Sequence, residues 1–295
     1  MSKANGYPVI KSGMHSLVSW RVSGVGQADA LLVSVIMPVL NEADTLGNSV
    51  ASLQSVLDAS AWCGHYEIIV ADNGSTDGSA SIAKALGVRV ITVPTMGYGS
   101  ACWHACQQAQ GGILLFFDGD GSPHPADCIA LIQQIHSGAG LAIGVRQCPE
   151  PNSMSRAQIF GNALACFLMR VLWRIPASDI GPLRAIARTV FDQIELRDRG
   201  FGWTVEMQIS AATAGFPIVE IPVRWRTRAA GVSKIGGTWL GVMRAGWGIL
   251  GKIAVVRLRD SFRDKQPIRY HCVDHCDVFT DLRFSETTHS PRKPL

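Results

Sequence analysis

The stretch Phe116-Phe117-Asp118-Gly119-Asp120-Gly121-Ser122 places two carboxylates directly after an apolar run. The run from Ile113 to Phe117 has the composition of a buried strand that ends at these acids. In an open α/β sheet, ligands bind at the carboxyl ends of the strands. Two aspartates at that edge repel each other, which favours a divalent cation that carries a diphosphate. A solvated polar turn is the alternative interpretation.

Units with the same organisation precede this stretch along the chain. Each consists of a short apolar run, a polar turn and a segment with apolar residues at helical spacing. We expect strands at residues 31–37, 66–71 and 88–93, and helices near residues 46–57, 82–86 and 101–110. Strands that alternate with helices at this spacing predict an α/β fold with parallel strands and right-handed crossovers.

Acidic side chains follow three of the predicted strands. They are Glu42 after the first strand, Asp72 and Asp77 after the second, and Asp118 and Asp120 after the strand quoted above. Since the carboxyl ends of parallel strands meet at one edge of a sheet, we expect a ligand site there. Helix capping is the alternative role for Asp77, whereas Asp72 ends a strand and does not begin a helix.

The composition is that of a globular chain with one large domain or two small ones. Of the 295 residues, 47% are hydrophobic and 17% are charged, and the net charge of +4 is mild. Lysine and arginine form no block typical of nucleic-acid binding, so we expect no nucleic-acid partner. Most of the eight cysteines lie in apolar runs, which favours reduced thiols and a cytoplasmic setting.

Residues 1–30 mix Gly, Ser, Lys and His without an apolar core, so we expect a flexible leader and no secretory signal. No run of about 18 uncharged apolar residues occurs, so the sequence predicts no transmembrane span.

The pair Gly97 and Gly99 does not form a dinucleotide-binding fingerprint. Cys102 stands where that fingerprint has its third glycine, and the pair follows the third predicted strand and not the first. The two glycines indicate instead that the backbone approaches another group closely.

Four motifs together resemble the family 2 glycosyltransferases, in particular the branch of dolichol-phosphate mannose or glucose synthases. They are Pro38-Val39-Leu40-Asn41-Glu42, residues 70–78, Gly97-Tyr98-Gly99-Ser100-Ala101 and Asp118-Gly119-Asp120. The resemblance covers about residues 31–235. It implies a GT-A fold, with a Rossmann-like mixed, mainly parallel sheet flanked by helices. It also implies inverting transfer of a hexose from a nucleotide-diphosphate sugar such as GDP- or UDP-hexose.

The same resemblance implies roles for individual residues. Those expected around the nucleotide sugar are Pro38, Glu42, Asp72, Gly97 and Asp118, and those expected to hold Mg²⁺ or Mn²⁺ are Asp118, Asp120 and Ser122. Such a metal would neutralise the leaving nucleotide diphosphate.

The chain departs from the family pattern at four positions within or next to the four motifs. Val39 and Leu40 replace an aromatic residue and a small or polar one, Asn73 replaces a second acid, and Ser122 stands where this branch often has glutamine.

The second half of the chain should bind the acceptor. Arg146, at the end of a predicted strand over residues 141–146, is expected to face phosphate, with a surface arginine as the alternative. Asp179 and Arg184 lie in a segment that resembles a family motif, and they are expected near the sugar, the acceptor or phosphate. Capping of a loop is the alternative role for Asp179. Glu206 is expected to shape the pocket or to serve the dipole of its own helix.

Residues 156–174 form a helical pattern that is apolar almost all round. Arg156, Arg170 and Arg174 lie within roughly 40° of one another on a helical wheel. A basic helix with an apolar middle suits a membrane surface, where its arginines would reach lipid or acceptor phosphates. A core helix with arginines at its ends is the alternative.

Residues 228–234 resemble the family loop that closes over the donor diphosphate, through Arg228, Ser233 and Lys234, with a solvated basic turn as the alternative. We expect a second amphipathic interfacial helix at 236–257, which could instead pack on the core, and a polar tail at 258–295. The cluster from His271 to Cys276 is a weak zinc candidate.

Together these features predict a membrane-peripheral glycosyltransferase at the cytoplasmic face, with a polyprenyl phosphate as acceptor. Catalysis is assigned to Asp120, Asp179, Arg146 and Lys234. An acceptor phosphate is already an anion, so no strong base is required. The alternatives are a soluble or glycan hydroxyl acceptor, for which Asp179 is the candidate base, and a sugar-nucleotide sensor without turnover.

Overall fold

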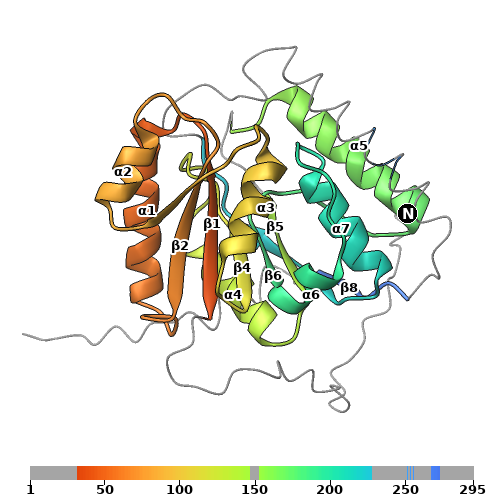
Figure 1. The fold of residues 1–295 in the computed structure, drawn as a ribbon. Coiled ribbons are helices and arrows are strands. Elements are labelled where there is room, and N and C mark those ends of the chain that lie inside the picture. The colour runs from red at the N-terminus through yellow and green to blue at the C-terminus, as the bar shows by residue number, and fades with distance from the viewer. Residues whose placement is uncertain are drawn as a thin grey trace, which may run out of the picture.

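The computed structural model describes residues 32–146, 153–227, 251, 253, 255 and 267–272. In this part of the chain, helices cover both faces of one eight-stranded sheet (Figure 1). The strands are β1 (Val33–Val39), β2 (Tyr66–Asp72), β3 (Arg89–Thr92), β4 (Ile113–Phe116), β5 (Leu141–Arg146), β6 (Arg184–Ala187), β7 (Ile218–Val223) and β8 (Tyr270–Cys272). The helices are α1 (Ala43–Asp58), α2 (Ser79–Ala85), α3 (Tyr98–Gln108), α4 (Asp127–His136), α5 (Arg156–Trp173), α6 (Arg188–Gln193) and α7 (Trp203–Thr213).

The sheet is mixed and mainly parallel. Its strand order is β3-β2-β1-β4-β6-β5-β7-β8, and β6 runs antiparallel to both of its neighbours. The remaining pairs are parallel, and Val39 at the end of β1 pairs with Asp72 at the end of β2. This arrangement confirms the predicted fold class, and it brings the carboxyl ends of β1, β2 and β4 to one edge.

Two apolar clusters, one on each face of the sheet, form the core. Alternate residues of β1 point to opposite faces, so Val35 belongs to one cluster and Ile36 to the other. Helices α1 and α4 cover the first face, and α3, α5 and α7 cover the second. All seven residues of β1 are buried, which is why its sequence is almost continuously apolar. Full burial of a Val, Leu or Ile side chain contributes about 1.5–3 kcal/mol.

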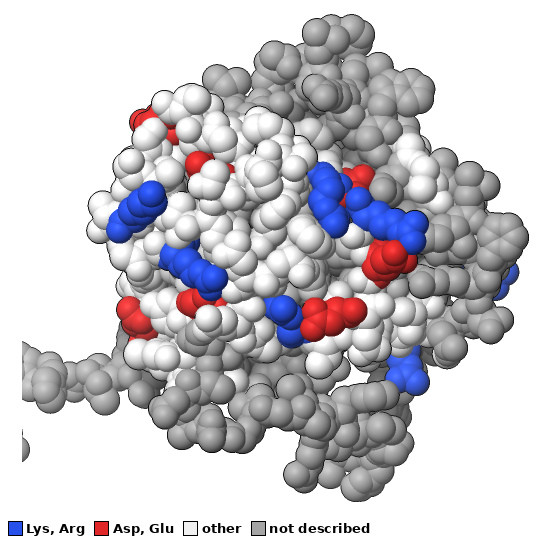
Figure 2. All heavy atoms as spheres, viewed as in Figure 1, with Lys and Arg blue, Asp and Glu red and all other residues white. Residues whose placement is uncertain are grey.

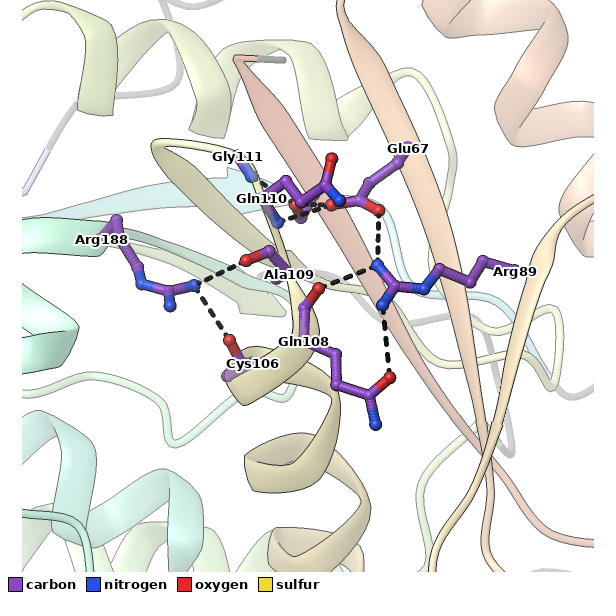
Figure 3. A network of polar contacts seen from close by, with 9 residues as sticks. Glu67, Arg89, Cys106, Gln108, Ala109, Gln110, Gly111 and Arg188 are labelled. Carbon is purple, nitrogen blue, oxygen red and sulfur yellow. Dashed lines mark hydrogen bonds and ion pairs between the residues drawn. The ribbon is translucent and has the colours of Figure 1, made fainter. Parts of the chain in front are cut away.

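Two arginines hold the C-terminal end of α3 at the opposite edge of the sheet (Figure 3). The Nη1 group of Arg89 donates to the carbonyl oxygen of Gln108 at 2.8 Å. The Nη1 group of Arg188 donates to the carbonyl oxygens of Cys106 at 2.9 Å and Ala109 at 3.2 Å. Carbonyls at a helix C-terminus lack partners within the helix, so these cations complete their hydrogen bonding.

Helix α5 begins with a capping box that the sequence interpretation did not identify. The Ser155 side chain accepts from the amide of Gln158 at 3.2 Å, and the Gln158 side chain accepts from the amide of Ser155 at 2.8 Å. The two hydrogen bonds satisfy amides that the first turn of a helix leaves without partners. They explain why the helix starts at Arg156, as predicted.

The C-terminal predictions fall largely outside the described residues. Of the predicted helix at 236–257, residues 251, 253 and 255 are described as helical, with Ile253 buried and Val255 exposed. The predicted boundaries at 30, 235 and 257 also lie outside. None of the described helices is long and apolar enough to span a bilayer. On the face shown in Figure 2, acidic and basic side chains lie interspersed.

Candidate functional site

The two acids of the opening stretch lie in a tight turn after β4. Phe117 continues the strand, because its amide donates to the carbonyl oxygen of Ile36 at 3.0 Å. Asp120 is 3% exposed, and its Oδ1 accepts from the amide of Ser122 at 2.9 Å. Gly121 has a φ of 78°, a left-handed conformation that glycine adopts without strain. The chain therefore turns back so that Asp118 and Asp120 lie at the edge of the sheet.

Helix α1 packs directly on this turn. The carbonyl oxygen of Gly119 accepts from the hydroxyls of Thr45 at 3.1 Å and Ser49 at 2.9 Å. A Cβ atom on Gly119 would lie 2.7 Å from Oε2 of Glu42. That oxygen is the movable end of a flexible side chain, so the contact shows chiefly that Glu42 brings a third carboxylate beside the pair.

The loops after β1 and β2 are tied to each other at the same edge. Asp72 is 7% exposed, and its Oδ1 accepts from the amide of Ser75 at 3.1 Å. Oδ2 of Asp77 accepts from the amide of Ala43 at 2.9 Å, and its Oδ1 accepts from the Ser79 hydroxyl at 2.6 Å. Burial raises the pKa of Asp77, but these hydrogen bonds outweigh burial and lower it. The geometry thus favours the structural role for Asp77.

Asn73 explains why the chain departs from the family's second acid. Its side-chain nitrogen donates to the carbonyl oxygen of Thr95 at 2.9 Å, and its side-chain oxygen accepts from the amide of Gly97 at 2.7 Å. A carboxylate could accept the second hydrogen bond but could not donate the first. The amide therefore fastens the loop before α3 to the end of β2.

Gly97 and Gly99 approach the protein's own backbone. A Cβ atom would lie 2.2 Å from the carbonyl oxygen of Arg199 if added to Gly97, and 2.9 Å from that of Asp198 if added to Gly99. The amide of Gly99 also donates to the carbonyl oxygen of Gly200 at 3.1 Å. The expected close approach is therefore to residues 198–200. Substrate binding by Gly97 stays a prediction.

The predicted pocket residue Glu206 holds this partner segment in place. Its side chain is 1% exposed, and Oε2 accepts from the amides of Arg197 at 3.0 Å and Asp198 at 2.6 Å. Arg199 in turn lies over the ring of Trp103 in α3, 4.4 Å from its centroid. Through residues 198–200, the contacts of Glu206 reach the loop that contains Gly97 and Gly99.

The N-terminal turn of α3 also reaches the acidic pair directly. The Tyr98 hydroxyl donates to Oδ1 of Asp118 at 3.2 Å. Burial and the adjacent Asp118 carboxylate raise the pKa of Tyr98 well above its ordinary value. The phenol therefore keeps its proton and acts as a donor.

Arg146 and Asp179, both assigned to catalysis, form a buried ion pair. Nε and Nη2 of Arg146 donate to Oδ2 and Oδ1 of Asp179 at 2.9 and 2.6 Å, and the amide of Arg146 donates to Oδ2 at 2.8 Å. The two side chains are 13% and 4% exposed. The Arg146 guanidinium also lies 5.4 Å from the centroid of the Trp225 ring. Burial lowers the pKa of Arg146, but the hydrogen bonds and charge of Asp179 outweigh burial and raise it.

Arg184 and Arg156 lie in opposite environments. Arg184 is fully buried, and it donates to the carbonyl oxygens of Ile180, Gly181 and Thr204. Burial lowers the pKa of Arg184 to about 10. Arg156 is exposed at the start of α5. Substrate binding by either residue stays a prediction, although the contacts of Arg184 are with the chain itself.

A connection that the sequence interpretation missed joins the acidic turn to the end of β7. The amide of Arg226 donates to the carbonyl oxygen of Ser122 at 2.9 Å, and Pro123 and Trp225 form a bridge. The Arg224 side chain forms an ion pair with Asp127 at 2.6 Å. These partners lie about a hundred residues apart, so no local motif could indicate them.

The donor set at the acidic turn fits a hard divalent cation. No group of three or more His, Cys, Asp or Glu side chains suited to a metal occurs among the described residues. Asp118 and Asp120 offer carboxylate oxygens, and Mg²⁺ sites commonly combine one or two carboxylates with substrate phosphates and water. The pair therefore suits a metal that arrives with a diphosphate. The ligand role of Ser122, which is 3% exposed, stays a prediction.

Several predicted residues fall outside the described part of the chain. They are Arg228, Ser233 and Lys234, together with most of the zinc candidate at 271–276. Of that candidate, His271 and Cys272 are described, and the Cys272 thiol contacts Oε2 of Glu220 at 3.4 Å.

Comparison with known proteins agrees with this geometry. The family model described as glycosyl transferase family 2 matches residues 34–194, which is more than half of the chain. An uncharacterized glycosyltransferase of Mycobacterium tuberculosis is 31% identical over 71% of this chain and 92% of its own length. A polyprenol monophosphomannose synthase of Mycolicibacterium smegmatis is 28% identical over 74% of this chain and 88% of its own length.

Solved structures show the same fold. Glucosyl-3-phosphoglycerate synthase from M. tuberculosis, in complex with Mn²⁺, UDP and phosphoglyceric acid, has a TM-score of 0.62 at 22% identity, covering 80% of this chain and 87% of its own. Mannosyl-3-phosphoglycerate synthase from Rubrobacter xylanophilus has a TM-score of 0.61 at 18% identity, covering 80% and 76%. The matched family model and the relatives show that the chain belongs to glycosyl transferase family 2 and is a glycosyltransferase.

Proposed function

We propose that this chain transfers a hexose from a nucleotide-diphosphate sugar to a polyprenyl phosphate at a membrane surface, with Mg²⁺ or Mn²⁺ at the donor site. The relatives support the donor class, since one solved neighbour holds Mn²⁺ and UDP. The polyprenol monophosphomannose synthase supports the lipid acceptor through its name.

The donor site is the edge formed by the ends of β1, β2 and β4. Asp118 and Asp120 are the residues that would hold the metal, which would stabilise the charge that develops on the leaving diphosphate. Glu42 and Asp72 lie at the neighbouring strand ends and are assigned to the nucleoside. The hydrogen bonds from Thr45 and Ser49 to Gly119 hold the acidic turn before the substrate arrives, so no energy is spent on ordering it.

The ion pair of Asp179 with Arg146 is the main observation that favours a phosphate acceptor over a hydroxyl acceptor. A hydroxyl acceptor needs a general base, and Asp179 is the candidate for it. Both oxygens of its carboxylate accept hydrogen bonds from Arg146. To take up a proton, Asp179 would have to give up part of a buried ion pair, which is costly. An acceptor phosphate needs no base, because its oxygen is already anionic.

Helix α5 presents an apolar face that suits a lipid surface. Four large apolar side chains on this helix are exposed: Ile159 (52%), Phe160 (69%), Phe167 (58%) and Val171 (59%). Ile159, Phe160 and Phe167 lie between Arg156 and Arg170, and Val171 lies between Arg170 and Arg174. All three arginines are exposed. Apolar side chains would enter the acyl boundary, while the arginines extend to anionic head groups. The same face would bring the phosphate of a polyprenyl acceptor to the enzyme.

The reaction follows as one in-line displacement. An oxygen of the acceptor phosphate attacks the anomeric carbon of the hexose, and the bond to the nucleotide diphosphate breaks on the opposite side. The configuration at that carbon is therefore inverted. Asp118 and Asp120 act on the departing side, and no protein side chain has to remove a proton from the acceptor.

A transfer assay with radiolabelled UDP- and GDP-hexoses tests the proposal. The protein is incubated with Mn²⁺ or Mg²⁺ and extracted polyprenyl phosphate, and the organic phase is counted. Label in the organic phase, lost on chelation of the metal, is the expected result. Retention of full activity in the presence of a chelator would contradict the metal assignment.

Two alternatives give different outcomes in the same assay. Transfer only to water-soluble acceptors would replace the lipid by a soluble or glycan hydroxyl. Tight donor binding without transfer or hydrolysis under any condition would indicate a sugar-nucleotide sensor.

A further inference from the structure

Tyr98 connects two parts of the molecule that are distant in sequence. It is the first residue of α3, and its hydroxyl donates to Oδ1 of Asp118 at 3.2 Å. The side chain is half-buried and packs against the apolar cluster that contains α3. A hydroxyl in this position restricts the rotation of the Asp118 carboxylate. It could also serve merely as the hydrogen-bond partner that a buried tyrosine needs.

The backbone around Tyr98 is held from two opposite sides. On one side the Asn73 amide binds Thr95 and Gly97, which fastens the approach to α3 to the end of β2. On the other side the amide of Gly99 donates to the carbonyl oxygen of Gly200, and that of Ser100 donates to the carbonyl oxygen of Arg199.

The segment of residues 198–200, which contacts Gly99 and Ser100, is itself held by buried and local hydrogen bonds. Residues 197 and 198 are fastened by the buried carboxylate of Glu206. Oδ1 of Asp198 accepts from the amide of Gly200 at 2.7 Å, and this hydrogen bond closes the turn between the two residues.

The backbone on both sides of Tyr98 is fixed by close contacts with other segments. Both glycines beside Tyr98 contact neighbouring backbone so closely that a Cβ atom would lie less than 3.0 Å from it. A shift of the first turn of α3 would therefore break contacts on both sides. The ring of Tyr98 is held by the supports at its backbone, and the hydroxyl transmits that rigidity to Asp118.

We infer that Tyr98 is a positioning residue for the donor site, which sets the orientation of the Asp118 carboxylate toward a divalent metal and nucleotide diphosphate. The inference rests on the proposed function, because it assumes that Asp118 binds the metal. Asn73 and Glu206 act one step further away, by holding the backbone on either side of Tyr98.

The test is the Mn²⁺ affinity of the Tyr98→Phe variant. Electron paramagnetic resonance measures it in the presence of UDP and, in a parallel experiment, of GDP. The substitution removes the hydroxyl and keeps the ring. We expect about tenfold weaker Mn²⁺ binding, since a hydrogen bond to a charged group is lost. Tyr66→Phe is the matched control, because the Tyr66 hydroxyl also donates to a carboxylate, that of Asp58, at 2.7 Å. This control should bind Mn²⁺ as the unmodified protein does.

Each outcome decides the inference. Unchanged Mn²⁺ affinity in a folded Tyr98→Phe protein would overturn it while leaving the proposed function intact. Absence of nucleotide-dependent Mn²⁺ binding in the unmodified protein would overturn the metal assignment itself.

Asn73→Ala provides a second route if Tyr98→Phe does not fold. It leaves the tyrosine in place and removes the hydrogen bonds to Thr95 and from Gly97 without adding a charge, and the inference then requires weaker Mn²⁺ binding in this variant. Mn²⁺ affinity equal to that of the unmodified protein would overturn it.

Discussion

The proposed donor edge, at the ends of β1, β2 and β4, and the second half of the chain, proposed to bind the acceptor, differ in how their charged side chains are paired. At the donor edge, acidic side chains from three strand ends gather, and their turns are held by hydroxyls and amides such as those of Thr45, Ser49 and Ser122. In the acceptor half, basic side chains are bound to acids or carbonyls of the chain itself, as in Arg146 with Asp179 and Arg184 with backbone carbonyls.

The difference bears on the proposed metal site. Clustered carboxylates are stabilised by an added cation, so the edge with the acidic turn is where we propose that the metal binds. Arg146 is neutralised by Asp179, and Arg184 is hydrogen-bonded to backbone carbonyls, so both arginines contribute first to structure. Three exposed arginines, Arg156, Arg170 and Arg174, lie instead along α5 and at its C-terminal end, beside its apolar face.

The largest effect is expected at the donor edge. Asp120→Ala removes a carboxylate assigned to the metal, and we expect transfer to fall by about a thousandfold, as for the loss of a main electrostatic group in catalysis. The radiolabelled-donor assay measures it. Asp58→Ala is the matched control, because Asp58 lies at the end of α1 and binds Tyr66. Similar losses of activity in both variants would show that the effect is not specific to the acidic turn.

Breaking the buried ion pair between Arg146 and Asp179 should mainly lower the free energy of unfolding. Arg146→Ala leaves the Asp179 carboxylate, 4% exposed, without its cation, and we expect a loss of about 3–5 kcal/mol in the free energy of unfolding. Urea denaturation measures this loss. Adding Asp179→Asn to that variant should recover part of it, because the buried charge is then absent. A double variant less stable than Arg146→Ala would contradict the pairing.

The face of α5 offers a test that separates lipid contact from folding. Phe160→Ser combined with Phe167→Ser should weaken binding to anionic vesicles by about tenfold or more, because two exposed apolar side chains no longer enter the lipid. Sedimentation with vesicles measures the binding. The thermal midpoint should hardly change, since both side chains are exposed.

The control for this test is Met96→Ser. Met96 is 66% exposed but lies outside α5, so vesicle binding should be retained. Equal binding of the double variant and the unmodified protein would contradict lipid contact by α5.

The smallest effect is expected at the edge opposite the site. Arg188→Ala removes a cation from the C-terminal carbonyls of α3, and we expect a loss of about 1 kcal/mol in the free energy of unfolding. Mn²⁺ binding should remain unchanged, because this network lies at the far end of the helix (Figure 3). A large loss of Mn²⁺ affinity would show that the two ends of α3 are coupled.

Much of the donor edge could be predicted from the sequence. The apolar runs indicated β1, β2 and β4, and the acids after them were expected to meet at one edge. That reasoning succeeds because each run is local and parallel strands align their carboxyl ends. The family resemblance rested on the same local motifs, and the family is confirmed.

The sequence by itself determined the fold class, the family and the place of the acidic turn. The tertiary structure alone decided which neighbours each polar group binds. It showed that Gly97 and Gly99 face residues 198–200, that Arg146 holds Asp179, and that Arg224 holds Asp127 across 97 positions. The physical reason is that secondary structure follows from the spacing of nearby residues, whereas a buried charge takes whichever partner the packed chain brings within hydrogen-bond distance.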